Sequence, residues 1–177
     1  ALYRECAREL ALPGVTVDVY SDRDLATRRG EVVASLRRAD AFVGSLVFDY
    51  DDVEFLAPLV ERVAGPRLVF ECATELMAAN RVGAFAMGGA GGGGGAAPGP
   101  PPAVKAILSR FGSGREEDKL AGYLELLKVG PELLRLVPGD AAADLRAWLT
   151  AYRYWNAGGK ENVVAMLELV GARLLRD

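Results

Sequence analysis

The stretch from Ala41 to Cys72 constrains the fold of this chain more than any other. Two short apolar runs, at 41–48 and 67–70, enclose an acidic loop at 49–52 and an amphipathic segment that ends near Val63. A strand, a crossover helix and a second parallel strand are the simplest interpretation. The first run is almost continuously apolar, as is typical of a parallel strand covered on both faces. We therefore expect an α/β fold in which 41–48 forms a central strand.

Carboxylates follow both predicted strands, at Asp49, Asp51, Asp52, Glu71 and Glu75. Open α/β sheets place their ligand crevices at the carboxyl ends of the strands. The carboxylates could bind a hard cation through oxygen ligands, or two of them could form an acid–base pair. An aspartate before a helix is also what N-capping requires, and Asp51 or Asp52 could fill that role. We favour capping, and we assign no catalytic and no metal-binding residue to this chain.

The residues before this stretch predict a helix, a strand and a second helix. The segment 1–12 carries apolar residues at helical spacing and ends at Pro13-Gly14, which is typical of a helix followed by a turn. In the segment 15–20, valines alternate with Thr, Asp and Tyr, which favours a half-buried strand. Ser21 and Asp24 have the spacing of a capping box at the start of the next helix.

The charge distribution argues against a nucleic-acid partner. The net charge is -3, with acidic and basic residues interspersed, so the footprint expected for binding a phosphate backbone is missing. Among the arginines of the helix after Ser21, Arg28, Arg29, Arg37 and Arg38 lie mostly off its apolar face. They could form a patch for an anionic ligand, but a solvated outer helix face explains them without one, and we favour it. The apolar runs are too short for a transmembrane segment.

Histidine-based chemistry is excluded because the chain contains no histidine. Zinc sites of the HExxH type and triads that need imidazole therefore cannot form within it. The two cysteines, Cys6 and Cys72, lack the spacing of metal ligands, and this usage fits a reducing compartment. Cys72 follows a predicted strand and could be a nucleophile. Since no histidine is present to lower the pKa of its thiol, we expect a buried thiol.

A glycine- and proline-rich run divides the chain into three parts. We expect a truncated α/β head at 1–87, a flexible linker at 88–102 and a helical segment at 103–177. The head should contain a small, open, mostly parallel sheet of the flavodoxin or Rossmann type. The composition is 51% hydrophobic, which is enough for a core. The chain starts and stops at predicted helices, so we expect a fragment of a longer protein.

Aromatic residues cluster in the helical segment at Trp148, Tyr152, Tyr154 and Trp155. Aromatic faces stack on flat ligands, which suggests a site for a planar molecule. Three of the four nevertheless lie on one apolar helical stripe, which has to be buried in any case. We favour core packing.

Four ordered segments resemble the amino-terminal region of the large H subunit of magnesium chelatase, within the family shared with cobaltochelatases. They are GSLVFDYDDVEFLAPLVE (44–61), RLVFECATELMAANRVGAFAM (67–87), PPAVKAILSRFGSGREEDKLAGYLELLKVGPELLRLVPGD (101–140) and DLRAWLTAYRYWNAGGKENVVAML (144–167). The resemblance covers nearly the whole chain, interrupted only by the glycine- and proline-rich run. It implies that the opening strand of the family's sheet would precede Ala1.

The resemblance implies a parent enzyme that inserts Mg²⁺ into protoporphyrin IX in chlorophyll and bacteriochlorophyll biosynthesis. This ligase forms nitrogen–metal bonds, its H subunit binds the porphyrin, and two AAA+ motor subunits, of the I and D types, use ATP. A plant or algal member would lie in the chloroplast stroma, with peripheral contact to the envelope or thylakoid membrane, and a bacterial one in the cytoplasm. The metal-insertion site is attributed to the later body of the protein. No family catalytic residue maps to a position here, and no cofactor is expected on this part.

Three hypotheses follow for the chain. In the first, the chain is a non-catalytic head of the chelatase subunit, needed for assembly or for admitting the porphyrin. In the second, it belongs to a regulatory tetrapyrrole-binding paralogue without chelatase activity. In the third, it is an independent small-ligand domain whose site is the acidic edge. The substrate-binding residues are unknown at this stage.

Overall fold

The computed structural model describes residues 2–87 and 139–175 and, between them, the single positions Glu117, Ala121, Leu124, Glu125, Leu127 and Lys128. The helices are α1 (Leu2–Glu9), α2 (Asp22–Thr27), α3 (Arg29–Arg38), α4 (Tyr50–Val60), α5 (Thr74–Met77), α8 (Asp140–Ala157) and α9 (Gly159–Glu168), followed by a π-helical turn, η1 (Leu169–Leu174). The strands are β1 (Phe42–Ser45), β2 (Arg67–Phe70), β3 (Arg81–Val82) and β4 (Phe85–Ala86). The linker predicted at 88–102 and most of the helices predicted at 103–137 lie outside the described residues.

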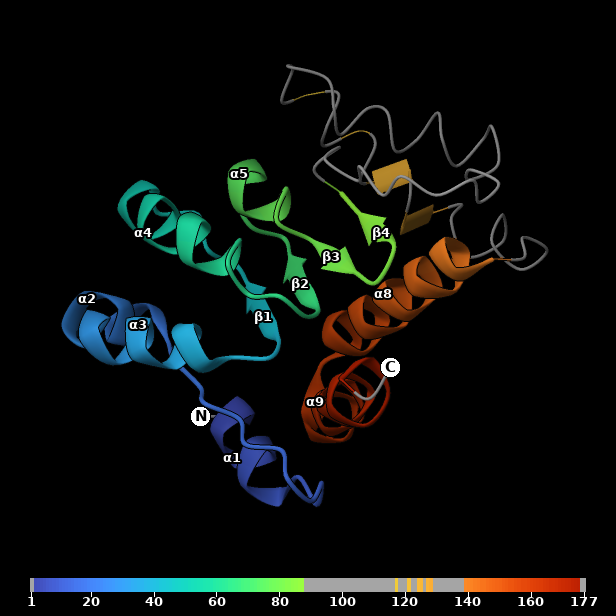
Figure 1. The fold of residues 1–177 in the computed structure, drawn as a ribbon, viewed down its shortest axis with the longest axis horizontal. Coiled ribbons are helices and arrows are strands. Elements are labelled where there is room, and N and C mark those ends of the chain that lie inside the picture. The colour runs from blue at the N-terminus through green and yellow to red at the C-terminus, as the bar shows by residue number, and fades with distance from the viewer. Residues whose placement is uncertain are drawn as a thin grey trace.

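One mixed sheet, in the order β1-β2-β3-β4, organises the described part of the chain. It opens with the parallel pair β1 and β2, in which Phe42 lies opposite Arg67, and continues through two antiparallel pairings. Figure 1 shows α3 and α4 on one side of this sheet and α8 on the other. The expected α/β class, with a small open sheet and a helical C-terminal part, is confirmed. Within the described ranges, no helix is long and apolar enough to cross a membrane.

The prediction that 41–48 forms a central strand is wrong, because β1 lies at the edge of the sheet and β2 takes the inner place. The residues of β1 are only half-buried, whereas Leu68, Val69 and Phe70 of β2 are all 0% exposed. A continuous apolar run indicates that both faces of a strand are at least partly buried. It does not report how many neighbouring strands there are, and that number is set by tertiary structure.

The strand predicted at 15–20 does not form, although the segment keeps the predicted alternation of exposure. Thr16 and Asp18 are exposed, while the three valines are half-buried. Side-chain packing holds the segment in place of a strand partner: a Cβ built on Gly171 of η1 would lie 3.3 Å from Val15. The period-two pattern therefore predicted the burial correctly, but it could not supply a neighbour for the backbone.

The side chain of Asn80 extends the sheet where β3 is too short to do so. The backbone N–H of Val69 donates to Asn80 Oδ1 (2.7 Å), and Asn80 Nδ2 donates to the carbonyl oxygens of Val69 (2.8 Å) and Met77 (3.0 Å). From the other side, the indole N–H of Trp148 in α8 donates to the same Oδ1 (2.7 Å). One buried amide thus satisfies the backbone of β2 and fixes the position of α8.

Around this amide, aromatic rings fill the space between α8 and the sheet. Trp148 is 0% exposed, with its ring centroid 5.7 Å from that of Phe70 and 6.0 Å from that of Phe85. Tyr152 and Trp155 also contact the Phe70 ring, at 5.8 and 5.5 Å. The core-packing interpretation of the aromatic stripe is therefore confirmed for these residues.

Replacing Asn80 tests how much the fold depends on this amide. Asn80→Ala removes the side-chain partner of the buried N–H and C=O of Val69 and one hydrogen bond of the Trp148 indole, so we expect the free energy of unfolding to fall by about 3 kcal/mol. Urea denaturation followed by circular dichroism measures the loss. The control is Asn156→Ala on the exposed surface of α8, which should change stability by less than about 0.5 kcal/mol. Equal effects of the two substitutions would contradict the role of Asn80.

Candidate functional site at the carboxyl ends of β1 and β2

The candidate site begins where β1 and β2 end, and at both ends the backbone is left-handed. Leu46 has φ 59° and Glu71 has φ 47°, a region that costs a non-glycine residue about 1–2 kcal/mol. The two turns are joined by backbone hydrogen bonds from Leu46 N–H to the carbonyl oxygen of Phe70 (3.2 Å) and from Ala73 N–H to that of Val47 (2.9 Å). These contacts keep the strand ends in register and set the direction of the loop that enters α4.

Asp49 is the residue that caps α4. Its Oδ1 accepts hydrogen bonds from the backbone N–H groups of Asp51 (3.1 Å) and Asp52 (3.2 Å), which lie in the first helical turn. The prediction that Asp51 or Asp52 is the cap is therefore wrong, because the helix begins earlier, at Tyr50. Asp52 lies 3.7 Å from Arg29 of α3, and burial, followed by the negative charge of Asp49, raises the pKa of its carboxyl. An aspartate of the acidic loop therefore caps the helix as we expected, but the aspartate is Asp49.

The two glutamates after β2 have partners of their own. Glu71 accepts a hydrogen bond from the hydroxyl of Tyr152 in α8 (3.0 Å), and the hydroxyl of Thr74 lies 3.4 Å from the carboxylate of Glu75, an exposed residue. Across the part of the chain that the structure describes, no three His, Cys, Asp or Glu residues come together to hold a metal ion. The geometry thus gives no support to the cation-site hypothesis for this edge.

Cys72 is a buried thiol behind the same edge. It is 5% exposed, and the Val47 N–H donates to its Sγ (3.4 Å). Burial raises the pKa of the thiol, which disfavours the thiolate that a nucleophile needs. The expectation of a buried thiol at Cys72 is therefore confirmed. Cys6 is likewise a buried, free thiol.

Exposed apolar side chains are the unusual property of this edge. Leu46 is 60% exposed, Phe48 62% and Tyr50 75%, and together we call them the apolar loop. Three large exposed apolar residues within five positions are a candidate contact surface, whereas single exposed residues need no explanation. Sequence reasoning missed the loop because it placed Leu46 and Phe48 inside the predicted strand. The clue available in the sequence was the cap-forming aspartate at position 49, which ends a strand before the helix.

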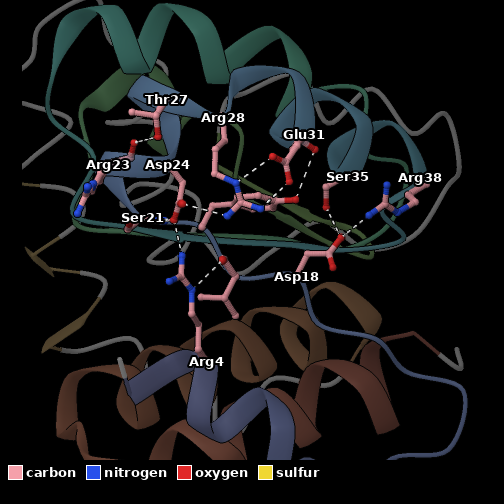
Figure 2. A network of polar contacts seen from close by, with 12 residues as sticks. Arg4, Asp18, Ser21, Arg23, Asp24, Thr27, Arg28, Glu31, Ser35 and Arg38 are labelled. Atoms are coloured by element: carbon pink, nitrogen blue, oxygen red, sulfur yellow. Dashed lines mark hydrogen bonds and ion pairs between the residues drawn. The ribbon is translucent and has the colours of Figure 1, made fainter.

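Three of the four predicted arginines, Arg28, Arg29 and Arg38, form ion pairs, so the four do not make an open basic patch. Arg28 contacts Asp24 (3.1 Å) and Glu31, and Arg38 contacts Asp18 (2.6 Å), as Figure 2 shows. Within the described ranges, Arg37 has no ion pair, and its side chain is exposed to solvent. The preferred interpretation, a solvated helix face, describes Arg37 and Arg38, whereas Arg28 also lines a pocket beside α1.

A family model matches most of this chain. The family is described as a domain of unknown function (DUF3479), and its model matches residues 1–149. The match therefore includes the whole α/β part and the first half of α8.

Proteins similar in sequence to this chain are named as H subunits of magnesium chelatase. The chain is 30% identical over 152 residues to the magnesium-chelatase H subunit of Chlorobaculum parvum, covering 85% of this chain and 11% of that protein. It is 28% identical over 144 residues to the chloroplastic magnesium-chelatase ChlH subunit of Oryza sativa subsp. indica, covering 77% and 9%. With the H subunit of Cereibacter sphaeroides it shares 25% identity over 167 residues, covering 91% and 13%. The chain spans about a tenth of the length of these relatives.

Substitutions at the acidic edge separate capping from ligand binding. Asp49→Ala removes the cap and should lower the free energy of unfolding by about 1 kcal/mol in urea denaturation.

Asp51→Asn combined with Asp52→Asn should leave the affinity of the chain for Mg²⁺ unchanged in calorimetry, because neither carboxylate belongs to a ligand cluster. A tenfold loss of affinity in the double variant, about 1.4 kcal/mol, would show that these two carboxylates bind the ion and would overturn the interpretation of the acidic edge as a capping loop only.

Proposed function

The chain belongs to the DUF3479 family, and from that premise we propose that it is the amino-terminal head of a magnesium-chelatase H subunit. The head is non-catalytic and serves assembly of the whole protein. The proposal is supported by relatives of that name, which match 77–91% of this chain.

In this proposal the parent protein is the porphyrin-binding subunit of an enzyme that inserts Mg²⁺ into protoporphyrin IX for chlorophyll or bacteriochlorophyll biosynthesis. AAA+ subunits of the I and D types supply ATP hydrolysis. The relatives come from bacteria and from a chloroplast, so the parent acts in the bacterial cytoplasm or the chloroplast stroma, with peripheral contact to envelope or thylakoid membranes in the second case. Porphyrin and Mg²⁺ are its substrates, and both bind to the body of the parent protein.

The observation that carries the assembly role is the apolar loop, at Leu46, Phe48 and Tyr50. Its residues are 60–75% exposed, and one of them, Leu46, has a costly left-handed backbone with φ 59°. Burying one such side chain contributes about 1.5–3 kcal/mol, so a partner surface gains from covering the loop. The relatives contain roughly ten times the sequence seen here, and we assign the partner surface to that remaining part of the parent protein.

A non-catalytic role fits the way in which the other candidate groups are used. The Trp148 ring stacks in the core at 0% exposure, and the Tyr152 hydroxyl bonds Glu71. Asp49 is occupied as a helix cap. These three groups, which could have contacted a porphyrin or a metal ion, are thus used to hold the fold.

Hydrogen exchange in the complete H subunit tests the assembly role. If the rest of the protein covers the apolar loop, the backbone amides of 48–50 exchange more slowly in the complete protein than in this chain alone. Phe48→Ser with Tyr50→Ser should return them to the faster rate and lower the chelatase rate measured by the fluorescence of the magnesium porphyrin. The control is Leu2→Ser, a 37% exposed leucine on α1. Equal exchange in the complete protein and the isolated chain would contradict the proposal.

Titration with protoporphyrin IX tests the non-catalytic role. We expect no shift of the Soret band and no saturable quenching of tryptophan fluorescence when the isolated chain is titrated to tens of micromolar porphyrin, because Trp148 is enclosed by Phe70 and Phe85 and Trp155 packs against Phe70. Saturable quenching would sink this part of the proposal. It would favour the alternative, a regulatory tetrapyrrole-binding paralogue, if the complete parent protein also failed to form the magnesium porphyrin with motor subunits and ATP.

A further inference from the structure

A pocket of about 260 Å³ lies between α1, the extended segment 17–20 and the junction of α2 and α3. Three of the residues that line it are arginines, Arg4 and Arg8 from α1 and Arg28 from the junction, while Asp18 is the acidic one. Its volume corresponds to eight or nine liquid waters at about 30 Å³ each, which is more than a bare inorganic anion requires. It lies just below the roughly 300–1,000 Å³ of drug-sized ligand sites, so it would suit a smaller organic molecule.

Asp24 holds two of these arginines in position. Its carboxylate contacts the guanidinium groups of both Arg4 and Arg28, and it also accepts from the Ser21 backbone N–H (2.9 Å), as Figure 2 shows. Arg28 is fixed further by Glu31 (Nε to Oε1, 3.0 Å). A guanidinium has five N–H donors in a planar fork, so groups anchored in this way keep donors for a ligand.

Arg8 differs from the other two arginines. Among the residues that the structure describes, it has neither an ion pair nor a hydrogen bond, and its side chain is exposed beside the pocket. Asp18 is the single acidic residue of the lining. Its carboxylate accepts hydrogen bonds from the Ser35 hydroxyl (2.6 Å) and from Arg38 (2.6 Å). Asp18, Asp24 and Glu31 pair with Arg4, Arg28 and Arg38, so among the described residues Arg8 is the guanidinium of the pocket lining that has no carboxylate partner.

The rest of the pocket is apolar or weakly bonded. Val17, Val19 and Tyr20 contribute to the lining. The Tyr20 hydroxyl reaches the Glu31 carbonyl oxygen only at 3.4 Å, and Arg4 Nε reaches the Val19 carbonyl oxygen at 3.4 Å. Hydrogen bonds this long are weak, so both donors can turn to a bound acceptor at little cost.

From this arrangement we propose that the pocket binds a small organic anion, with a carboxylate or phosphate group at Arg8 and an apolar body against Val17, Val19 and Tyr20. Arg4 and Arg28, anchored by Asp24, supply further N–H donors to the anionic group. Planar guanidinium groups bind carboxylate and phosphate oxygens in pairs, which gives the site a preference for these two classes. The proposal does not depend on the assembly role, because the apolar loop contributes no residue to the pocket.

Binding of benzoate, phenyl phosphate and the neutral benzyl alcohol to the complete 177-residue chain tests the proposal. At constant ionic strength, we expect saturable shifts of the Tyr20 and arginine Nε–H resonances with benzoate, phenyl phosphate or both, and weaker shifts with benzyl alcohol. The anion that binds more tightly identifies the headgroup as carboxylate or phosphate. Equal binding of benzyl alcohol would overturn the proposal, as would no saturable shift with either anion at millimolar concentration.

Matched variants test the assignment of Arg8. Arg8→Gln should weaken binding of the anion about fivefold, which corresponds to an exposed ion pair of about 1 kcal/mol. Arg37→Gln removes the same charge from the exposed surface of α3 and should leave affinity within about twofold of the unmodified chain. Circular dichroism verifies that both variants are folded, which we expect because neither side chain has an ion pair within the described ranges. An equal loss in the two variants would show nonspecific charge screening and would overturn the site.

Discussion

The buried amide of Asn80 is the contact on which the rest of this structure depends. It bonds the backbone of Val69 on one side and the indole of Trp148 on the other, so the sheet and α8 share a single polar group. Hydrophobic packing alone is non-directional and would allow α8 to slide over Phe70 and Phe85. A hydrogen bond at 2.7 Å in a fully buried site restricts that freedom, since it forms only at one position of the indole relative to Asn80.

The position of α8 then has consequences at the surface. With α8 fixed, the hydroxyl of Tyr152 reaches the carboxylate of Glu71, the residue that follows β2 in a left-handed conformation. The turn at Glu71 is joined through Phe70 and Ala73 to the turn that follows β1, where the apolar loop begins. The exposure of the loop is therefore connected to the core through a continuous series of contacts. This explains how a leucine can remain in a strained, exposed position that gains nothing from local packing.

Local sequence patterns predicted much of this architecture. β2 forms at 67–70 as expected, the Ser21–Asp24 capping box is present, and the stripe on α8 packs into the core. Each of these follows from a period or a spacing within about one helical turn or strand. The edge position of β1, the absence of a strand at 15–20 and the shift of the α4 cap to Asp49 were not predicted. The first two depend on which segments become neighbours, and the third depends on where a helix starts.

Asn80 and Arg8 show why the most informative residues were the hardest to predict. In sequence, Asn80 is one polar residue before a short strand, and only the arrival of Trp148 from 68 residues away makes it a core residue. Arg8 is one of several exposed arginines. It becomes distinctive only because Asp24 and Asp18 engage its neighbours and leave it unmatched. Whether a charged side chain is available for a ligand depends on the ion pairs that the surrounding side chains form as well as on its own. A pairing of this kind is a property of the folded surface, and no spacing in the sequence encodes it.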